Sequence, residues 1–303
     1  MKNVFLTLAL CVSLSGMAQL VNVGSIEKVN IPTNEVNKIA AISPAGDYVL
    51  ITTDYNKGLT KFDLNTGEST LVTNAEGAGF DAKISQDGQS IVYREKSVNN
   101  KHLRLTALKS KDLTTGESKQ IVKASRNLNG AAIQGKTAIA INKGKMEKKA
   151  LGSDKAKVEM PVVYVNQNHQ LFVNNNGKTR QLAPLGNQCR YIWPSVSPDG
   201  TKALFFVSGK GAYVCNIDGS GVQSLGIVRA PKWYGNNLIV GMNDQDNGEV
   251  YTSSEIVVVD LQGNRQVLTD SNVIAMYPQP SADGSKIAFS TPTGEAYIIN
   301  IAK

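Results

Sequence analysis

"PSVSPDGTKALFFV", Pro194–Val207, is an extended segment that enters a tight Asp-Gly turn and leaves as an apolar strand. Gly suits the turn because it adopts a positive φ at no steric cost, and an Asp side chain hydrogen-bonds the turn backbone. Five further stretches follow the pattern, at intervals of roughly 35 to 65 residues. Such a repeat of short strands and Gly turns predicts a radial or solenoid β-array. The clear copies are Ala40–Ile51, Ala82–Tyr93 and Pro278–Ser290, and the weaker ones are Ala131–Ile141 and Ala230–Gly241.

A second kind of turn recurs after most of these hairpins. A third strand ends in Asp or Asn followed by Gly, and a short fourth strand such as Ser69–Val72 comes next. Four antiparallel strands per repeat are typical of a propeller blade, so the six hairpin stretches predict six blades. The second turns lie at Phe62–Ser69, Lys111–Ser118, Val173–Arg180, Asn216–Gln223 and Val259–Gln266.

The two ends of the chain complete one another. The sixth repeat stops after its third strand, Ala296–Ile301, and an early strand, Ser25–Ile31, has no hairpin partner. Pairing of these two segments would complete the last blade, close the ring and remove exposed strand edges. We therefore predict an all-β fold: one six-bladed β-propeller domain at 19–303, with four-stranded antiparallel blades and a ring closed by the N-terminal strand.

The repeats resemble those of a known family. "WPSVSPDGTKALFF", Trp193–Phe206, and "YPQPSADGSKIAFS", Tyr277–Ser290, are similar to the repeats of TolB-like, WD-repeat-like bacterial propellers. The resemblance extends over residues 25–303. It implies a six-bladed propeller that serves as a non-enzymatic binding platform in the bacterial envelope.

The first 18 residues have the composition of a signal peptide. Lys2 supplies the charge, Val4–Leu14 the apolar stretch, and Ser15–Ala18 a small-residue cleavage site before Gln19. The apolar stretch is shorter than the ~20 residues of a membrane-spanning helix. The sequence therefore predicts a signal peptide at 1–18, no membrane span, and a mature protein that is periplasmic or secreted.

The charge of the chain is modest. Its 303 residues carry a formal net charge of +7, which is mild for this length and predicts no binding of nucleic acid. Cys189 and Cys215 both lie in the fourth repeat. An oxidising compartment would permit a disulfide between them, and two separate buried thiols are the alternative.

Two features that resemble catalytic motifs have plainer interpretations. "GAAIQGKT", Gly130–Thr137, matches the phosphate-binding loop, which requires a helix after it. Here an alternating segment follows, so we predict a hairpin turn. His102 and His169 fall in different repeats and are expected to be surface strand or turn residues. We predict no catalytic residue, no cofactor and no metal.

Two polar segments are expected to lie in solvent. Asp244, Asp246, Asn247 and Glu249 crowd one region, as in oxygen-rich calcium loops, but the calcium-hand spacing is not met. We expect a solvated hairpin loop there. The Lys-rich stretch Asn142–Met160 lacks alternation and is expected to be a surface excursion of the third repeat, with contact to a partner as the alternative.

Candidate binding residues stand where the first strand of each repeat begins. In a propeller the first strand lines the axis, so these positions should gather at one channel mouth. Large rings there would contribute binding energy, and Arg or Asp would fix orientation. The alternative is that the two aromatic residues wedge between neighbouring blades. The candidates are Asp81, Trp193, Arg229 with its neighbour Ala230, and Tyr277, and the apolar Ile39 takes the matching place in the first repeat.

These observations lead to an expected function. We expect an exported, monomeric, non-enzymatic scaffold that binds a protein or glycan partner at the channel mouth. One alternative is a propeller-fold polysaccharide lyase or hydrolase, although the chain has only 2 histidines and no nucleophile-elbow motif. Another alternative is a structural subunit of an envelope assembly, without a small-ligand site.

Overall fold

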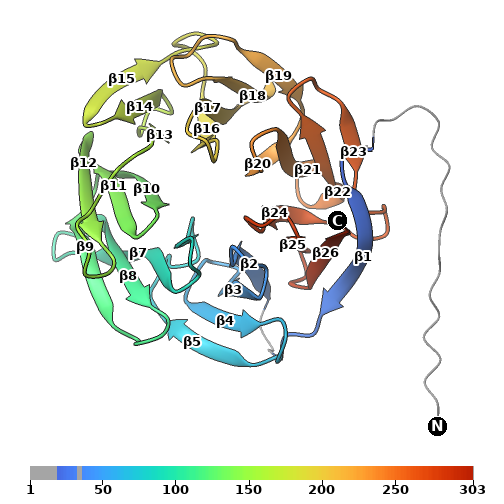
Figure 1. Cartoon of the computed structure of the whole chain (residues 1–303), viewed down its shortest axis with the longest axis horizontal. Coiled ribbons are helices and arrows are strands. Elements are labelled where there is room, and N and C mark those ends of the chain that lie inside the picture. The colour runs from blue at the N-terminus through green and yellow to red at the C-terminus, as the bar shows by residue number, and fades with distance from the viewer. Residues whose placement is uncertain (1–18, 33–35, 303) are drawn as a thin grey trace.

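The computed structural model describes residues 19–32 and 36–302, which form a closed ring of sheets around a central axis (Figure 1). These residues contain strands but no helix, and therefore no helix long and apolar enough to cross a membrane. The predicted all-β fold is confirmed. The predicted signal peptide, residues 1–18, lies outside the described residues.

Seven antiparallel sheets, here called blades, follow one another around the ring. Blade one is β2 (Asn37–Ile42), β3 (Tyr48–Thr53), β4 (Leu59–Asp63) and β5 (Ser69–Thr73), and blade two is β6 (Lys83–Ile84), β7 (Ser90–Val98), β8 (Arg104–Asp112) and β9 (Ser118–Ser125). Blade three is β10 (Leu128–Gln134), β11 (Thr137–Asn142) and β12 (Lys145–Ala150), and blade four is β13 (Val162–Val165), β14 (Leu171–Asn175) and β15 (Lys178–Leu182). Blade five is β16 (Tyr191–Val196), β17 (Lys202–Val207), β18 (Gly211–Asn216) and β19 (Gln223–Gly226), and blade six is β20 (Arg229–Tyr234), β21 (Leu238–Asp246), β22 (Tyr251–Asp260) and β23 (Arg265–Val267). Blade seven is β24 (Met276–Pro280), β25 (Lys286–Ser290), β26 (Ala296–Ala302) and β1 (Asn22–Val29).

The predicted count of six blades is wrong, because one blade lacks its first strand. Within the described residues, blades three and four have three strands each. β13 pairs antiparallel with β14 and corresponds to β7, the second strand of blade two. The turn after it closes with a bond from Asn166 N to Gln170 O, as the turn between β7 and β8 closes from Asn99 N to Leu103 O. The six blades were predicted from hairpin stretches, each of which joins a first strand to a second strand. Blade four has no first strand and therefore no such stretch, so it was not counted.

Residues 142–160, expected to be a surface excursion, divide into a strand and a crossing. β12 pairs with β11 along its full length, from Asn142↔Lys145 to Thr137↔Ala150, so this part of the expectation is wrong. The segment 151–161 then leads directly to β13. The predicted hairpin turn in Gly130–Thr137 is confirmed, because β10 and β11 pair on either side of Gly135.

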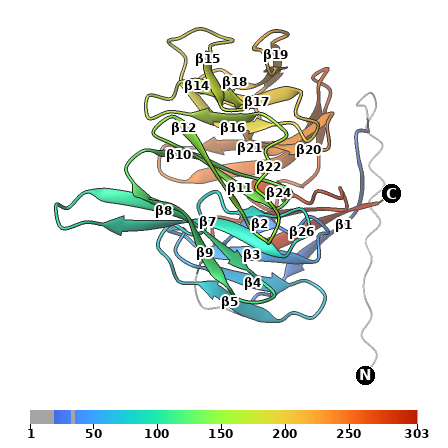
Figure 2. The same cartoon turned by 60° about the vertical axis from the view of Figure 1, so that its left-hand side comes forward.

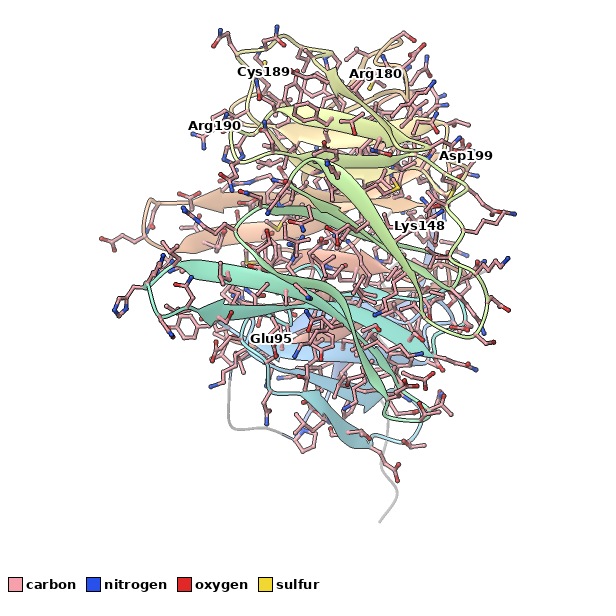
Figure 3. All side chains as sticks on the ribbon, turned by 90° about the vertical axis from the view of Figure 1, so that its left-hand side faces the viewer. Glu95, Lys148, Arg180, Cys189, Arg190 and Asp199 are labelled. Atoms are coloured by element: carbon pink, nitrogen blue, oxygen red, sulfur yellow. The ribbon has the colours of Figure 1, made fainter. Side chains whose placement is uncertain are left out.

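The ring has two faces that differ in their loops. On one, the strand-start face, the inner strands begin and the second and third strands are joined. On the other, the glycine-turn face, lie the hairpin turns found in the sequence, with Gly46, Gly88 and Gly200 at positive φ. Figure 3 shows the ring from its side, with Cys189 and Arg190 on the strand-start face and Asp199 on the glycine-turn face.

The core is divided among the spaces between blades. Side chains on a strand alternate between its two faces, and both faces of β17 are covered. Ala203 and Phe205 pack towards blade four, whereas Leu204 and Phe206 pack towards blade six. A second strand is therefore apolar throughout, which explains the continuous "ALFFV" run after the turn.

The predicted closure of the ring is confirmed. β1 is the outer strand of blade seven and pairs antiparallel with β26, from Asn22↔Ala302 to Val29↔Ala296. Ahead of β1, Gln266 of blade six binds the backbone of residues 20 and 21. Its Oε1 accepts bonds from Leu20 N at 2.7 Å and Val21 N at 3.0 Å, and its Nε2 donates to Val21 O at 3.0 Å.

Candidate functional site

The predicted site residues share an unusual backbone conformation at the start of the inner strands. Asp81, Trp193, Ala230 and Tyr277 have φ of 57°, 50°, 46° and 54°. In β16, β20 and β24 the pairing with the second strand skips two residues at this point, as in a β-bulge. A left-handed conformation is costly for a residue other than Gly and persists only where the surroundings impose it. These residues therefore occupy equivalent places in their blades.

A second set of equivalent positions lies two residues further along these strands. Each pairs with an apolar residue of the second strand in the same register. The pairs are Lys83↔Val92, Ser195↔Leu204, Lys232↔Val240 and Gln279↔Ala288. Four inner strands thus present a polar side chain at one depth along the axis, which we call the polar level.

Asp81 belongs to a cluster of cations near the axis. It forms an ion pair with Lys83 and lies 3.9 Å from Nη2 of Arg94. Burial would raise the pKa of Asp81, but Lys83, Lys232 and Arg94 together hold it below its ordinary value. Burial and the charge of Lys83 lower the pKa of Lys232 to about 8. Lys232 lies in blade six and the other members in blade two, so the cluster spans the axis.

Arg229 is held by a buried carboxylate. Its Nη1 lies 2.9 Å from Oδ2 of Asp244, whose side chain is 0% exposed, while Arg229 remains 38% exposed. Burial raises the pKa of Asp244, and Arg229 offsets part of that effect. Asp244 lies in β21 opposite Ser254, so the expectation that it belongs to a solvated loop is wrong. Only residues 247–250 form the turn.

Tyr277 and Trp193 lie in different surroundings. Tyr277 is half-buried between blades six and seven, where its backbone N contacts Sδ of Met242 at 3.4 Å. Burial and a hydrogen bond with Tyr251 raise the pKa of Tyr277. This is the wedge expected in the packing alternative. Trp193 is 38% exposed and meets Phe206 of its own blade edge-on, with ring centroids 5.4 Å apart.

The candidates therefore fall into three groups. Arg229 and Tyr277 both interact with Asp244. Arg229 lowers the pKa of Asp244, and the charge of Asp244 raises the pKa of Tyr277. Asp81 lies with the cations of the polar level, and Trp193 rests on Phe206. The polar level itself was not predicted from the sequence. The feature of the sequence that could have indicated it is a Lys two residues after a candidate position in two repeats. These are Lys83 after Asp81 and Lys232 after Ala230.

Exposed apolar side chains gather on the strand-start face. Of the 11 large hydrophobic residues that are exposed among the described residues, seven lie on loops or strand ends of this face. The glycine-turn face carries one, Val222, and the outer strands carry the other three. The seven are Val36, Tyr55, Phe80, Val98, Trp193, Ile227 and Val250.

Two long hairpins rise from the same face. The strands of β7–β8 and β21–β22 have 9 or 10 residues, against 4 to 7 for second and third strands elsewhere in the described chain. Figure 2 shows the β7–β8 hairpin projecting from the ring. Val98, 62% exposed, lies near one tip and Val250, 61% exposed, near the other.

The two histidines lie in turns, and Cys189 and Cys215 do not form a disulfide. His102 and His169 occupy left-handed positions in turns of the strand-start face, so the prediction of turn residues is confirmed. Cys189 is half-buried and Cys215 buried, and both are free thiols. In residues 19–32 and 36–302, no three His, Cys, Asp or Glu side chains are grouped to share a metal ion.

Solved structures with a similar fold were found. A candidate TolB from Agrobacterium tumefaciens is 19% identical and aligns over 92% of this chain and 98% of its own, with a TM-score of 0.57. The fold is TolB-like. TolB from Acinetobacter baumannii is 16% identical over 76% of this chain, with a TM-score of 0.50. The alignment covers 54% of that TolB, so this chain matches about half of its length.

An oligogalacturonate lyase in complex with manganese is also similar, at 16% identity over 86% of this chain and 76% of its own, with a TM-score of 0.49. Neither a protein-family model nor a curated protein sequence matches the chain. At such low identities the two TolB structures show the fold alone, and activity has to be argued from the site.

Proposed function

We propose that this chain is an exported, non-enzymatic propeller scaffold that binds a protein or glycan partner in the bacterial envelope, through its strand-start face. The signal-peptide composition of residues 1–18 supports export. The TolB-like fold is compatible with a rigid platform whose loops bind a partner.

The distribution of exposed apolar side chains carries this proposal. Scattered surface hydrophobics are normal, whereas their concentration on one face is typical of an interaction site. Seven of them lie on the strand-start face and only one on the glycine-turn face, within the described chain. Trp193 adds a large aromatic ring of the kind that dominates binding energy.

The long hairpins would give this surface depth. Their extra residues extend each about 10 Å beyond the shorter hairpins, at about 3.3 Å per residue. The tips differ in charge, with Lys101 and Arg104 on β7–β8 and Asp246 and Glu249 on β21–β22. A partner seated between them would meet opposite charges at its two sides, which would fix its orientation.

The test compares partner binding by matched variants of the full mature protein. Val98→Asp, Val250→Asp and Trp193→Ala alter the proposed surface, and Val222→Asp alters the exposed hydrophobic residue of the glycine-turn face. A partner recovered from the native envelope should bind the first three variants about tenfold more weakly or worse, and Val222→Asp unchanged. Equal binding by all four folded variants would refute the proposed face.

One observation favours the alternative of a polysaccharide lyase or hydrolase. Lys232 has a pKa lowered to about 8 near the axis, which is suitable for a general base. A panel of envelope polysaccharides, with and without divalent metal, separates the two functions. Turnover that disappears in Lys232→Met would establish the enzyme and overturn the non-enzymatic proposal.

A further inference from the structure

The polar level contains two lysines in opposite blades, near enough that the charge of Lys83 lowers the pKa of Lys232. Lys83 lies in blade two and Lys232 in blade six, at equivalent positions of their inner strands. Like charges repel, so this placement costs free energy unless something of opposite charge lies between them. Lys232 makes no ion pair or side-chain hydrogen bond with any residue that the structure describes, and Asp81 is the only carboxylate paired with Lys83.

The charge balance of the cluster leaves an excess of two positive charges. Three cations, Lys83, Arg94 and Lys232, surround one carboxylate, Asp81. The side chains of Asp81 and Lys83 are each 33% exposed, so water reaches them. Lys83 lies in β6 and Lys232 in β20, the inner strands of their blades, so the group faces the axis with the ring of blades around it (Figure 1). Charges placed among protein groups in this way are screened less than charges on the open surface.

Arg94 adds a buried cation with incomplete partners. The residue is 8% exposed, and its Nε is buried without a hydrogen bond. Its contact with Asp81 is 3.9 Å, beyond hydrogen-bond distance, and its guanidinium lies 5.6 Å from the ring of Phe80. A buried guanidinium is normally paired at close range. The Asp81 carboxylate is thus shared between Arg94 behind it and Lys83 beside it.

We infer that the polar level is a binding site for a doubly charged oxyanion group, held between Lys83 and Lys232 on the axis, with Asp81 and Arg94 keeping Lys83 in position. A dianion matches the excess charge and would separate the two ammonium groups. Both lysines are point charges with rotatable donors, which suits carboxylate or phosphate oxygens. This inference goes beyond the proposed function, because it concerns a small group on the axis and does not depend on the partner at the strand-start face.

The test measures binding of defined anions to the mature protein by calorimetry at low ionic strength and pH 7.5, where phosphate is mostly the dianion. Succinate and inorganic phosphate represent free dianions, and a short peptide with two adjacent Glu residues represents the same charge on a protein chain. At least one probe should bind. Lys83→Met and Lys232→Met should each weaken it by about tenfold or more, as for loss of a charged hydrogen-bond partner.

Lys123→Met is the matched control, because Lys123 is exposed on the outer strand β9 and its loss changes the net charge equally. It should leave binding unchanged. A second readout is the pKa of Lys232 by NMR, which should rise when the anion binds. Binding of none of the three probes, or equal loss in Lys123→Met, would overturn the inference. Tight binding of the peptide alone would assign the oxyanion to a protein chain.

Discussion

Replacing Arg229 with Ala separates a binding residue from a structural counter-ion. The variant leaves the Asp244 carboxylate buried at 0% exposure without its cation. Removing one partner of a buried ion pair costs about 3–5 kcal/mol. Because Arg229 is itself 38% exposed, solvent screens part of this interaction, and about 2 kcal/mol is the expected loss of unfolding free energy. The second change, Asp244→Asn in the same chain, removes the unpaired charge and should recover about 1 kcal/mol.

The loss of unfolding free energy in Arg229→Ala should depend on pH. Burial raises the pKa of Asp244 in the folded state, so the folded state binds the proton more tightly than the unfolded state. Its contribution to stability is therefore present at low pH and is lost as pH rises through the folded-state pKa. Without Arg229 that pKa rises further, so the destabilisation should be large at pH 7 and smaller at pH 4.5. Urea denaturation of the single and double variants measures both effects. Equal losses at the two pH values, or no recovery in the double variant, would show that Arg229 does not stabilise the buried charge of Asp244.

Two further predictions concern ring closure and the polar level. Gln266→Ala removes three hydrogen bonds to residues 20 and 21 and should lower the unfolding free energy by about 2–3 kcal/mol; Gln262→Ala, in the adjacent exposed turn, should change it little, and identical calorimetric melting of both would contradict the role of Gln266 in closure. Lys232 has its pKa lowered from 10.5 to about 8, so the unfolded state binds more protons in this window and the wild type should gain stability with rising pH relative to Lys232→Met. Parallel pH profiles of unfolding for the two proteins would contradict the lowered pKa.

The sequence predicts the blades that begin with a hairpin and misses the one that does not. Each hairpin is easy to recognise in the sequence. Its turn requires Asp or Asn with Gly, and its second strand, which is buried on both faces, is a continuous apolar run. Blade four begins with β13, which has only four residues. The segment before it, 151–161, does not have the hairpin pattern of the repeats. Its later turn at Val173–Arg180 is visible in the sequence, but nothing local shows that it belongs to a separate sheet. That information lies in the packing of Val163 and Leu171 against blade five.

The site shows a similar division between local and tertiary information. Equivalent placement of Asp81, Trp193 and Tyr277 could be predicted, because it depends on distance from a turn in the sequence. Their partners could not, since Asp244 and Lys232 come from other strands or from across the ring. Asp244 in particular reads as a loop residue among polar neighbours, and only the length of β21 shows that it lies within a strand.

The closing strand also determines how the molecule would be displayed from a surface. Asn22 and Ala302 are paired in blade seven, and Ile301 N donates to Ser285 O in a hairpin turn of the glycine-turn face. Both ends of the described chain therefore leave from the same point on the rim of that face. A tether fused to either end would attach the ring at its glycine-turn face. The two long hairpins on the strand-start face would then point away from the attachment, where a second molecule could bind them.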